Sequence, residues 1–263
     1  MPRVRVLCIG LFGVGLAATA LVGHAGARPL GACERPADAE LISDRPDATE
    51  SAATVPARCW QLEGGATWEE AEDDESMTWG ELLLRYGVGD RWELRIGVPS
   101  YTDPGVGAAG FEDSSLGVKL LLARHDPDRP RRPQAALLLD STLPTGETGF
   151  REPHAQPAAL LALAWPLGAR TELATNLGAA YPSVEAEQFG TALASVAVGR
   201  ELSDRLGGFI ELFGASRDEP GGSARTFFDA GITWAATADL QLDLRAGIAL
   251  GPSDDEHFVG AGL

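Results

Sequence analysis

The stretch WELRIGV, residues 92–98, decides between the folds open to this chain. Its residues alternate between two faces, with Trp92, Leu94, Ile96 and Val98 on one and Glu93, Arg95 and Gly97 on the other. Such alternation predicts a β-strand with one apolar and one polar face. In a soluble sandwich the apolar face points into a core, whereas in a membrane barrel it points to lipid and the polar face lines the lumen. The rest of the sequence distinguishes these two possibilities.

Twelve alternating runs follow one another from residue 58 to the last residue. They lie near residues 58–69, 78–88, 92–101, 114–124, 134–143, 156–165, 171–181, 190–202, 206–215, 225–234, 240–249 and 256–263. Runs of about 9 to 11 residues suit a tilted membrane strand and exceed the roughly 5 to 6 residues usual in soluble sheets. Tight connections such as 89–91 and 203–205 alternate with long acidic ones such as 102–113 and 145–155. This rhythm is typical of the periplasmic turns and extracellular loops of an outer-membrane barrel, although the basic connection 124–133 is longer than expected.

The polar faces of these runs carry charges that a dry core would have to bury. We expect the following polar residues to line a lumen: Glu81, Arg85, Glu93, Arg95, Lys119, Asp140, Glu172, Asn176, Glu211, Asp229, Asp243 and Arg245. In a soluble barrel each buried charge would cost several kcal/mol unless it were paired, whereas a water-filled lumen solvates it. The sequence therefore predicts an all-β protein, an antiparallel transmembrane β-barrel of about 12 strands.

Aromatic residues gather near the ends of the apolar faces, where a bilayer interface favours them. They are Trp60, Trp68, Tyr86, Trp92, Trp165, Tyr181 and Trp234. Three further rings, Phe209, Phe213 and Phe227, share a strand face with the lumen carboxylates and are expected to point inward. Two interpretations of these rings stay open. They form a patch that binds an uncharged, ring-bearing solute, or they fill a narrow barrel.

Two hairpins allow predictions of register. If the hairpin around residue 237 is symmetric, Thr233 lies opposite Gln241, and Asp229 lies opposite Arg245 as a cross-strand ion pair.

In the other hairpin, a three-residue turn at 89–91 places Arg85 opposite Arg95. Glu93 is then diagonal to Arg85 and offsets the two like charges.

The N-terminal residues predict export. Arg3 and Arg5 precede an apolar run that ends at the small-residue site 25–27, which predicts a signal peptide over residues 1–27. A retained membrane helix and a lipoprotein anchor are the alternatives. Residues 28–57 contain four prolines and no sustained period, so we expect an irregular segment, either periplasmic or folded into the lumen as a plug, before the barrel at 58–263. Cys33 and Cys59 either join as a disulfide in an oxidising periplasm or remain free thiols.

Composition and motifs argue against several function classes. Without Arg3 and Arg5 the chain keeps 19 of its 21 basic residues against 38 acidic ones, an excess that argues against nucleic acid as a partner. Its remaining histidines are His125, His154 and His257, and no nucleophile, metal or phosphate-binding motif accompanies them. The sequence therefore predicts no catalytic residues, no cofactor and no metal.

Five stretches in this order resemble bacterial outer-membrane proteins of the MetA-pathway phenol-degradation family. They are ELISDRPDATES at 40–51, QLEGGATWE at 61–69, LLLRYGVGDRWELRIGVPSY at 82–101, SSLGVKLLL at 114–122 and LPTGE at 143–147. The resemblance implies an outer-membrane barrel that moves hydrophobic or aromatic compounds, and it supplies no catalytic residues. Barrels of this kind usually finish on an aromatic residue that the assembly machinery reads, whereas this sequence finishes on Leu263. Either the last strand is incomplete or the assembly signal is atypical.

Together these features predict a channel in the bacterial outer membrane for passive uptake or export of small, hydrophobic or aromatic solutes. Its other partners would be outer-membrane lipid and the barrel assembly machinery. A non-conducting structural barrel and a barrel enzyme that acts on lipid are the alternative functions.

Overall fold

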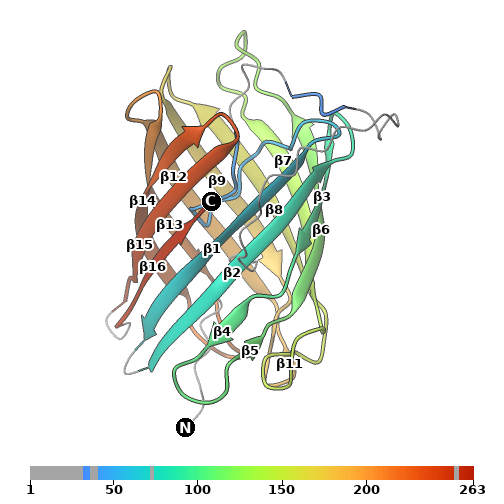
Figure 1. Ribbon diagram of the computed structural model, residues 1–263, viewed down its shortest axis with the longest axis vertical. Coiled ribbons are helices and arrows are strands. Elements are labelled where there is room, and N and C mark those ends of the chain that lie inside the picture. The colour runs from blue at the N-terminus through green and yellow to red at the C-terminus, as the bar shows by residue number, and fades with distance from the viewer. Residues whose placement is uncertain (1–31, 36–40, 72–73, 252–254) are drawn as a thin grey trace.

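The computed structural model describes residues 32–35, 41–71, 74–251 and 255–263, in which twelve antiparallel strands form a closed barrel (Figure 1). Around the ring the strands are β1 (Trp60–Ala71), β2 (Asp74–Gly87), β3 (Trp92–Gly97), β6 (Ser114–Ala123), β7 (Gln134–Leu143), β8 (Gln156–Pro166), β9 (Thr171–Ala180), β12 (Thr191–Glu201), β13 (Leu206–Ala215), β14 (Arg225–Thr237), β15 (Leu240–Ala249) and β16 (Glu256–Gly262). The ring closes because β1 pairs with both β2 and β16. The predicted fold class is confirmed, and the predicted signal peptide at 1–27 lies outside the described residues.

Four short strands lie outside the ring of twelve. They are β4 (Tyr101–Asp103), β5 (Gly110–Phe111), β10 (Ser183–Val184) and β11 (Glu187–Gln188). The run predicted as one strand at 92–101 is split into β3 and β4 around Pro99, which has no backbone N–H to give to a ladder. Among the residues that the structure describes, no helix is long and apolar enough to cross a membrane.

The two ends of the barrel differ in their connections. We call the end with the connections 88–91, 124–133, 167–170, 202–205 and 238–239 the turn end. The other end, with β4, β5, β10, β11 and the connections 144–155 and 216–224, is the loop end, drawn at the bottom of Figure 1.

The apolar stripe of each strand is the outer surface of the barrel. In β3, Trp92 is 49% exposed, whereas Glu93 and Arg95 are buried inside the ring. In β15, Leu244 is 48% exposed and Asp243 is buried. Trp60, Tyr181 and Trp234 are also exposed near strand ends, as expected for aromatic belts. The charged stripe faces inward, as the alternation predicts.

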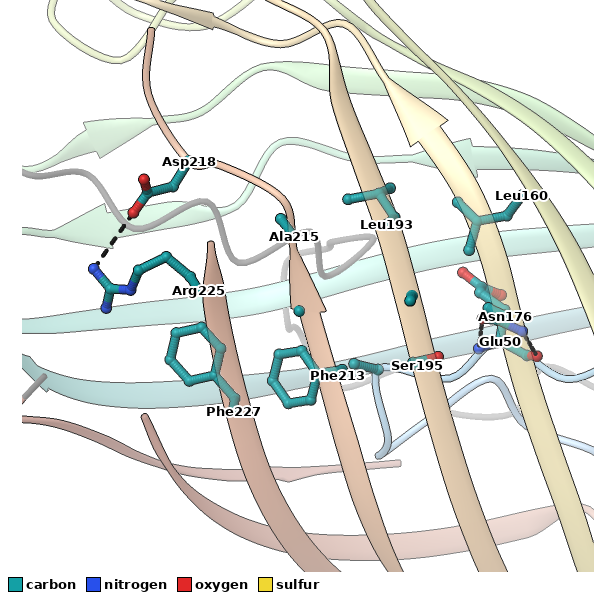
Figure 2. A pocket seen from close by; sticks show the side chains of 13 residues that line it. Glu50, Leu160, Asn176, Leu193, Ser195, Phe213, Ala215, Asp218, Arg225 and Phe227 are labelled. Atoms are coloured by element: carbon teal, nitrogen blue, oxygen red, sulfur yellow. Dashed lines mark hydrogen bonds and ion pairs between the residues drawn. The ribbon is translucent and has the colours of Figure 1, made fainter. Parts of the chain in front are cut away.

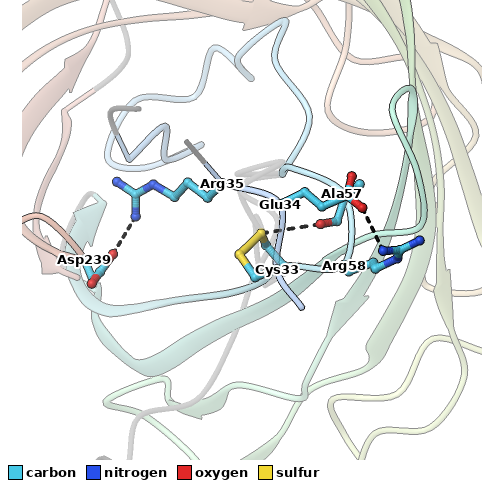
Figure 3. The surroundings of a disulfide bond; sticks show 7 residues. Cys33, Glu34, Arg35, Ala57, Arg58 and Asp239 are labelled. Atoms are coloured by element: carbon cyan, nitrogen blue, oxygen red, sulfur yellow. Dashed lines mark hydrogen bonds and ion pairs between the residues drawn. A yellow bond between two sulfur atoms is a disulfide. The ribbon is translucent and has the colours of Figure 1, made fainter. Parts of the chain in front are cut away.

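Residues 41–57, which we call the inner segment, run inside the ring of strands (Figure 3). At the turn end Ala57 forms a parallel bridge with Gly87 of β2, and Arg58 donates its backbone N–H to the Gly87 carbonyl at 2.6 Å. A Cβ at position 87 would stand 2.1 Å from the Pro56 carbonyl oxygen, so this close approach requires glycine. Of the two cysteine states left open by the sequence, the structure has the Cys33–Cys59 disulfide.

The hairpin between β14 and β15 corrects one prediction. The predicted pairs, Thr233 with Gln241 and Asp229 with Arg245, are wrong, because Asp229 lies opposite Gly247. The tight turn at 238–239 lies beyond Thr237 and moves each partner by three residues, and an irregularity between residues 235 and 237 takes one of these back, which leaves a shift of two. Asp229 still points into the lumen, where it is fully buried.

Candidate functional site

Three cations lie side by side on the inner surface of the barrel near the turn end and form what we call the cation wall. Arg85 of β2, Arg95 of β3 and Lys119 of β6 are each at most 1% exposed. The β2–β3 register places Arg85 opposite Arg95, which confirms that prediction. Glu93 accepts from Arg85 Nε at 2.8 Å and from Arg95 Nη1 at 3.2 Å, as the diagonal position requires. Glu63 of β1 also bonds Arg85, at 2.7 Å from Nη1, so two strand carboxylates are bonded to three buried cations and a further close acid is needed here.

The inner segment supplies the missing acids. Asp44 contacts Arg85 Nη1 at 3.1 Å and Lys119 Nζ at 2.8 Å, and it also bonds to Arg95. Glu50 accepts from Arg95 Nη2 at 2.9 Å and lies 3.6 Å from Lys119 Nζ. Burial by itself would raise the pKa of Asp44, but the three cations around it hold that pKa well below its usual range. The inner segment is thus held to this wall by charge.

A second ionic contact forms where the barrel closes. Arg45 of the inner segment bonds to Glu81 Oε2 of β2 at 2.5 Å and to Asp243 of β15 at 3.3 Å. Glu81 has a φ of 51°, a left-handed conformation that costs energy for a residue with a Cβ. Thr67 donates to the same carboxylate at 2.5 Å, so the bonds at this site compensate for the backbone strain.

The tip of the inner segment bonds to a different wall. We call residues 48–50 the apex. The Ala48 N–H donates to Glu211 Oε2 of β13 at 2.7 Å, and Thr49 Oγ1 lies 2.7 Å from Ser195 Oγ of β12. The Glu50 N–H donates to Asn176 Oδ1 of β9 at 2.7 Å, and Asn176 Nδ2 donates back to the Glu50 carbonyl at 3.0 Å.

The inner segment therefore spans the lumen from wall to wall. Strands β3 and β13 are six places apart in the ring of twelve, which puts them on opposite sides. The segment contacts Arg95 and Glu93 on β3, and Glu211 on β13. A solute that follows the lumen from one end to the other must pass these residues.

An apolar cavity lies on the loop-end side of the apex (Figure 2). Its floor includes Ala48 and Glu50, and its wall residues come from β8, β9, β12, β13 and β14. The rings of Phe213 and Phe227 stack there with centroids 5.2 Å apart and planes 13° apart. Arg225 lies 5.6 Å above the Phe227 ring. The cavity measures about 70 Å³, several times the roughly 10–15 Å³ that one water needs.

Arg225 is held by acids and so adds no net positive charge to the cavity. It lies 3.4 Å from an Asp218 carboxylate oxygen and 2.5 Å from one of Glu256. The cavity thus offers stacked rings, aliphatic carbons, one amide and one hydroxyl. Such a lining suits a small, uncharged ring.

The predicted lumen residues do not all gather at these two places. The contacts between the inner segment and the barrel use Glu81, Arg85, Glu93, Arg95, Lys119, Asn176, Glu211 and Asp243, and the cavity uses Phe213 and Phe227. Asp140 lies 3.8 Å from Arg95 Nε, and Glu172 is exposed at the turn end of β9.

Three other predicted residues lie away from the cavity. The Phe209 ring lies directly over Gly231, where a Cβ would clash with it. The Arg245 guanidinium carbon lies 5.0 Å from the centroid of the Phe258 ring. Among the described residues, the Asp229 carboxylate has no hydrogen-bond partner.

Sequence reasoning missed the residues of the inner segment that make these contacts. They are Asp44, Arg45, Ala48, Thr49 and Glu50, together with Glu63 of β1, which bonds Arg85 Nη1 at 2.7 Å. A charge balance could have found them, since the predicted lumen wall groups three cations around one neighbouring acid. The sequence also missed Phe258, whose ring lies 6.4 Å from Phe213 and is buried.

Comparisons with solved structures show the same fold. The chain is similar to an outer membrane channel from Pseudomonas putida F1 at 16% identity and a TM-score of 0.57, covering 87% of this chain and 98% of that one. It is similar to the NanC porin at 8% identity and a TM-score of 0.52, and to the KdgM porin in complex with disordered oligogalacturonate at 8% and 0.51. Each porin match covers 76% of this chain and 97% of the porin. No curated protein matches the chain.

The barrel is thus of the outer-membrane channel and porin type, with its apolar stripe outside and its charges inside. The family model described as "Putative MetA-pathway of phenol degradation" matches residues 43–263, which include the inner segment from Ser43 onward and the whole barrel. The resemblance drawn from the sequence is confirmed, and the chain belongs to this family.

Proposed function

We propose that the protein is a channel that carries small, uncharged, hydrophobic or aromatic solutes across the outer membrane without energy coupling. The loop end faces the exterior and the turn end faces the periplasm, since long loops are typical of the outer face of such barrels. In this proposal residues 1–27 are a removed signal peptide, residues 28–57 fold into the lumen, and residues 58–263 form the barrel. The barrel assembly machinery inserts it, and lipid covers its apolar surface.

The observation that carries this proposal is the ring-lined cavity inside the lumen. Phe213 and Phe227 stack in it, and its only cation among the lining residues, Arg225, is bonded to carboxylates. Most of the long loops at the same end are acidic, and the whole chain has a formal net charge of −17. This charge repels anions from the mouth of the barrel. An uncharged ring is therefore favoured over an aromatic carboxylate.

Uptake by cells tests the proposal. Cells that carry the gene are expected to take up radiolabelled phenol, at low external concentration, several times faster than cells without it. Benzoate uptake should differ little between the two strains. Equal phenol uptake, together with no ion current from the purified barrel in a planar bilayer, would favour the non-conducting structural barrel.

An enzyme that acts on lipid is the remaining alternative. In the described structure His257 faces the Glu70 carboxylate at 3.3 Å and the Trp68 ring at 5.2 Å, and nothing in this contact supplies a nucleophile. Ester hydrolysis in detergent micelles, abolished by His154→Ala, would support the enzyme instead. We expect no ester hydrolysis above background from the unmodified protein or from the His154→Ala variant.

Shortening one ring of the cavity tests the solute site. Phe213→Ala is expected to weaken phenol binding about 2- to 10-fold, because one stacked aromatic partner is lost. Phe209→Ala is the matched control, since Phe209 is also an inward ring of β13 but does not line the cavity. Calorimetric titration in detergent micelles measures both affinities. Equal losses in the two variants would show that the solute does not bind in the cavity beside Phe213 and Phe227.

A further inference from the structure

We propose that the apex, residues 48–50, is a gate between the cavity and the turn end of the lumen. A hydroxyl-bearing solute in the cavity opens this gate by taking over the hydrogen-bond partners that hold the apex. This inference rests on the proposed channel function and adds how passage is controlled.

The gate and the solute site share the same residues. Ala48 and Glu50 form part of the cavity floor, and their backbone N–H groups donate to Glu211 and Asn176 at 2.7 Å each. Asn176 and Ser195 line the cavity wall while they bond the apex (Figure 2). A solute that fills the cavity therefore touches both partners of the contact that it must break to move on.

The inner segment is held unequally along its length. On the N-terminal side of the apex, Asp44 and Arg45 bond to five buried charged groups of the wall. On its C-terminal side, Val55 donates to Glu93 at 2.8 Å, and the disulfide at Cys59 fixes the end. The Glu50 carboxylate of the apex also stays bonded to Arg95 on the β3 side. The contacts of the apex with β9, β12 and β13 are hydrogen bonds to an amide, a hydroxyl and the Glu211 carboxylate, which accepts from the Ala48 N–H and from Thr49 Oγ1. Because this far-wall contact contains no ion pair, whereas the other contacts of the segment are ionic networks or a disulfide, it is the contact that yields first.

The hydrogen-bonding groups of Asn176 determine which solutes can open the gate. Its amide offers an acceptor oxygen to the Glu50 N–H and a donor nitrogen to the Glu50 carbonyl. A phenolic hydroxyl both donates and accepts, so it replaces both Glu50 contacts while its ring stacks on Phe213. Toluene fills the same space but has no hydrogen-bonding group, so it binds without releasing the apex. Phenol is therefore expected to bind in the cavity and open the gate, whereas toluene is expected to bind without opening it.

A reversible cross-link tests the gate. The Oγ atoms of Thr49 and Ser195 are 2.7 Å apart, so the double variant Thr49→Cys, Ser195→Cys brings two thiols within disulfide reach. Single-channel currents are recorded in planar bilayers with phenol or toluene added at the loop end. In the unmodified protein phenol should raise the time spent in the open state several-fold, and toluene should not. The cross-linked variant should ignore phenol until a reductant is added.

The controls separate the gate from the channel. The two single cysteine variants show the effect of each substitution without a cross-link, and unmodified protein in reductant shows the effect of breaking Cys33–Cys59. Asn176→Ala should spend more time open without phenol, because the Glu50 backbone has lost both of its bonds to β9. A cross-linked variant that responds to phenol like the unmodified protein, or an equal response to toluene, would overturn the gate and leave the channel intact. Absence of both current and phenol uptake from the unmodified protein would overturn the channel itself.

Discussion

Replacing Asp44 with asparagine is expected to release the inner segment from the cation wall and to raise single-channel conductance several-fold. Asp44 is the residue of this segment that bonds Arg85, Arg95 and Lys119 together. All four side chains are at most 3% exposed. Removing one partner from a buried ion network costs about 3–5 kcal/mol, because the remaining charges stay desolvated. Glu63 and Glu93 belong to the strands and keep their bonds to the cations in this variant. The lost free energy is therefore that of the contact between the inner segment and the wall.

The matched control is Asp47→Asn, the same chemical change three residues away. Burial and the neighbouring carboxylates of Glu211 and Asp229 raise the pKa of Asp47 well above its usual value, so the charged form of this acid is disfavoured where it lies. Its replacement should leave conductance unchanged or lower. Planar-bilayer recordings of both variants check this pair. If Asp44→Asn conducts like the unmodified protein, the ion network does not hold the segment.

A charge on the outer stripe is expected to destabilise the whole barrel. Leu244 points outward near the middle of β15, so Leu244→Arg places a guanidinium in hydrocarbon. The expected loss in the free energy of unfolding is about 2–4 kcal/mol. Leu250→Arg is the control, because Leu250 is also exposed but follows the last residue of β15 at the loop end. Urea titration in lipid vesicles measures both, and equal midpoints for the two variants would mean that residue 244 does not face lipid.

The barrel was predictable because its signal is local and repeated. Alternation along WELRIGV already separates Trp92 and Leu94 from Glu93 and Arg95, and the tight and long connections repeat the pattern around the ring. The hairpin of β14 and β15 was predicted in the wrong register because its turn lies at 238–239 and is not centred on Thr237, and because β14 has one extra residue between 235 and 237. Nothing in the local sequence marks that extra residue.

The site was only partly predictable because its contacts are distant in the sequence. Asp44 meets Arg85, Arg95 and Lys119 across separations of 41, 51 and 75 residues, and the inner segment has no period that would orient its side chains. The strand partners were found from their inward parity, as were Phe213 and Phe227. The inward and outward alternation of side chains along the strands does not show whether the irregular segment lies in the periplasm or in the lumen.

The most direct test of the account is the conductance of a variant that lacks residues 41–57. Its lumen would no longer be spanned, and it would lose three acids, Asp44, Asp47 and Glu50, against one base, Arg45. Arg85, Arg95 and Lys119 would then face water beside the strand acids Glu63, Glu93 and Asp140. We predict a conductance several times that of the full chain and a reversal potential that shifts toward anions. A correctly folded variant, shown by heat-dependent gel mobility, that conducts no better than the full chain would contradict a lumen that the inner segment obstructs.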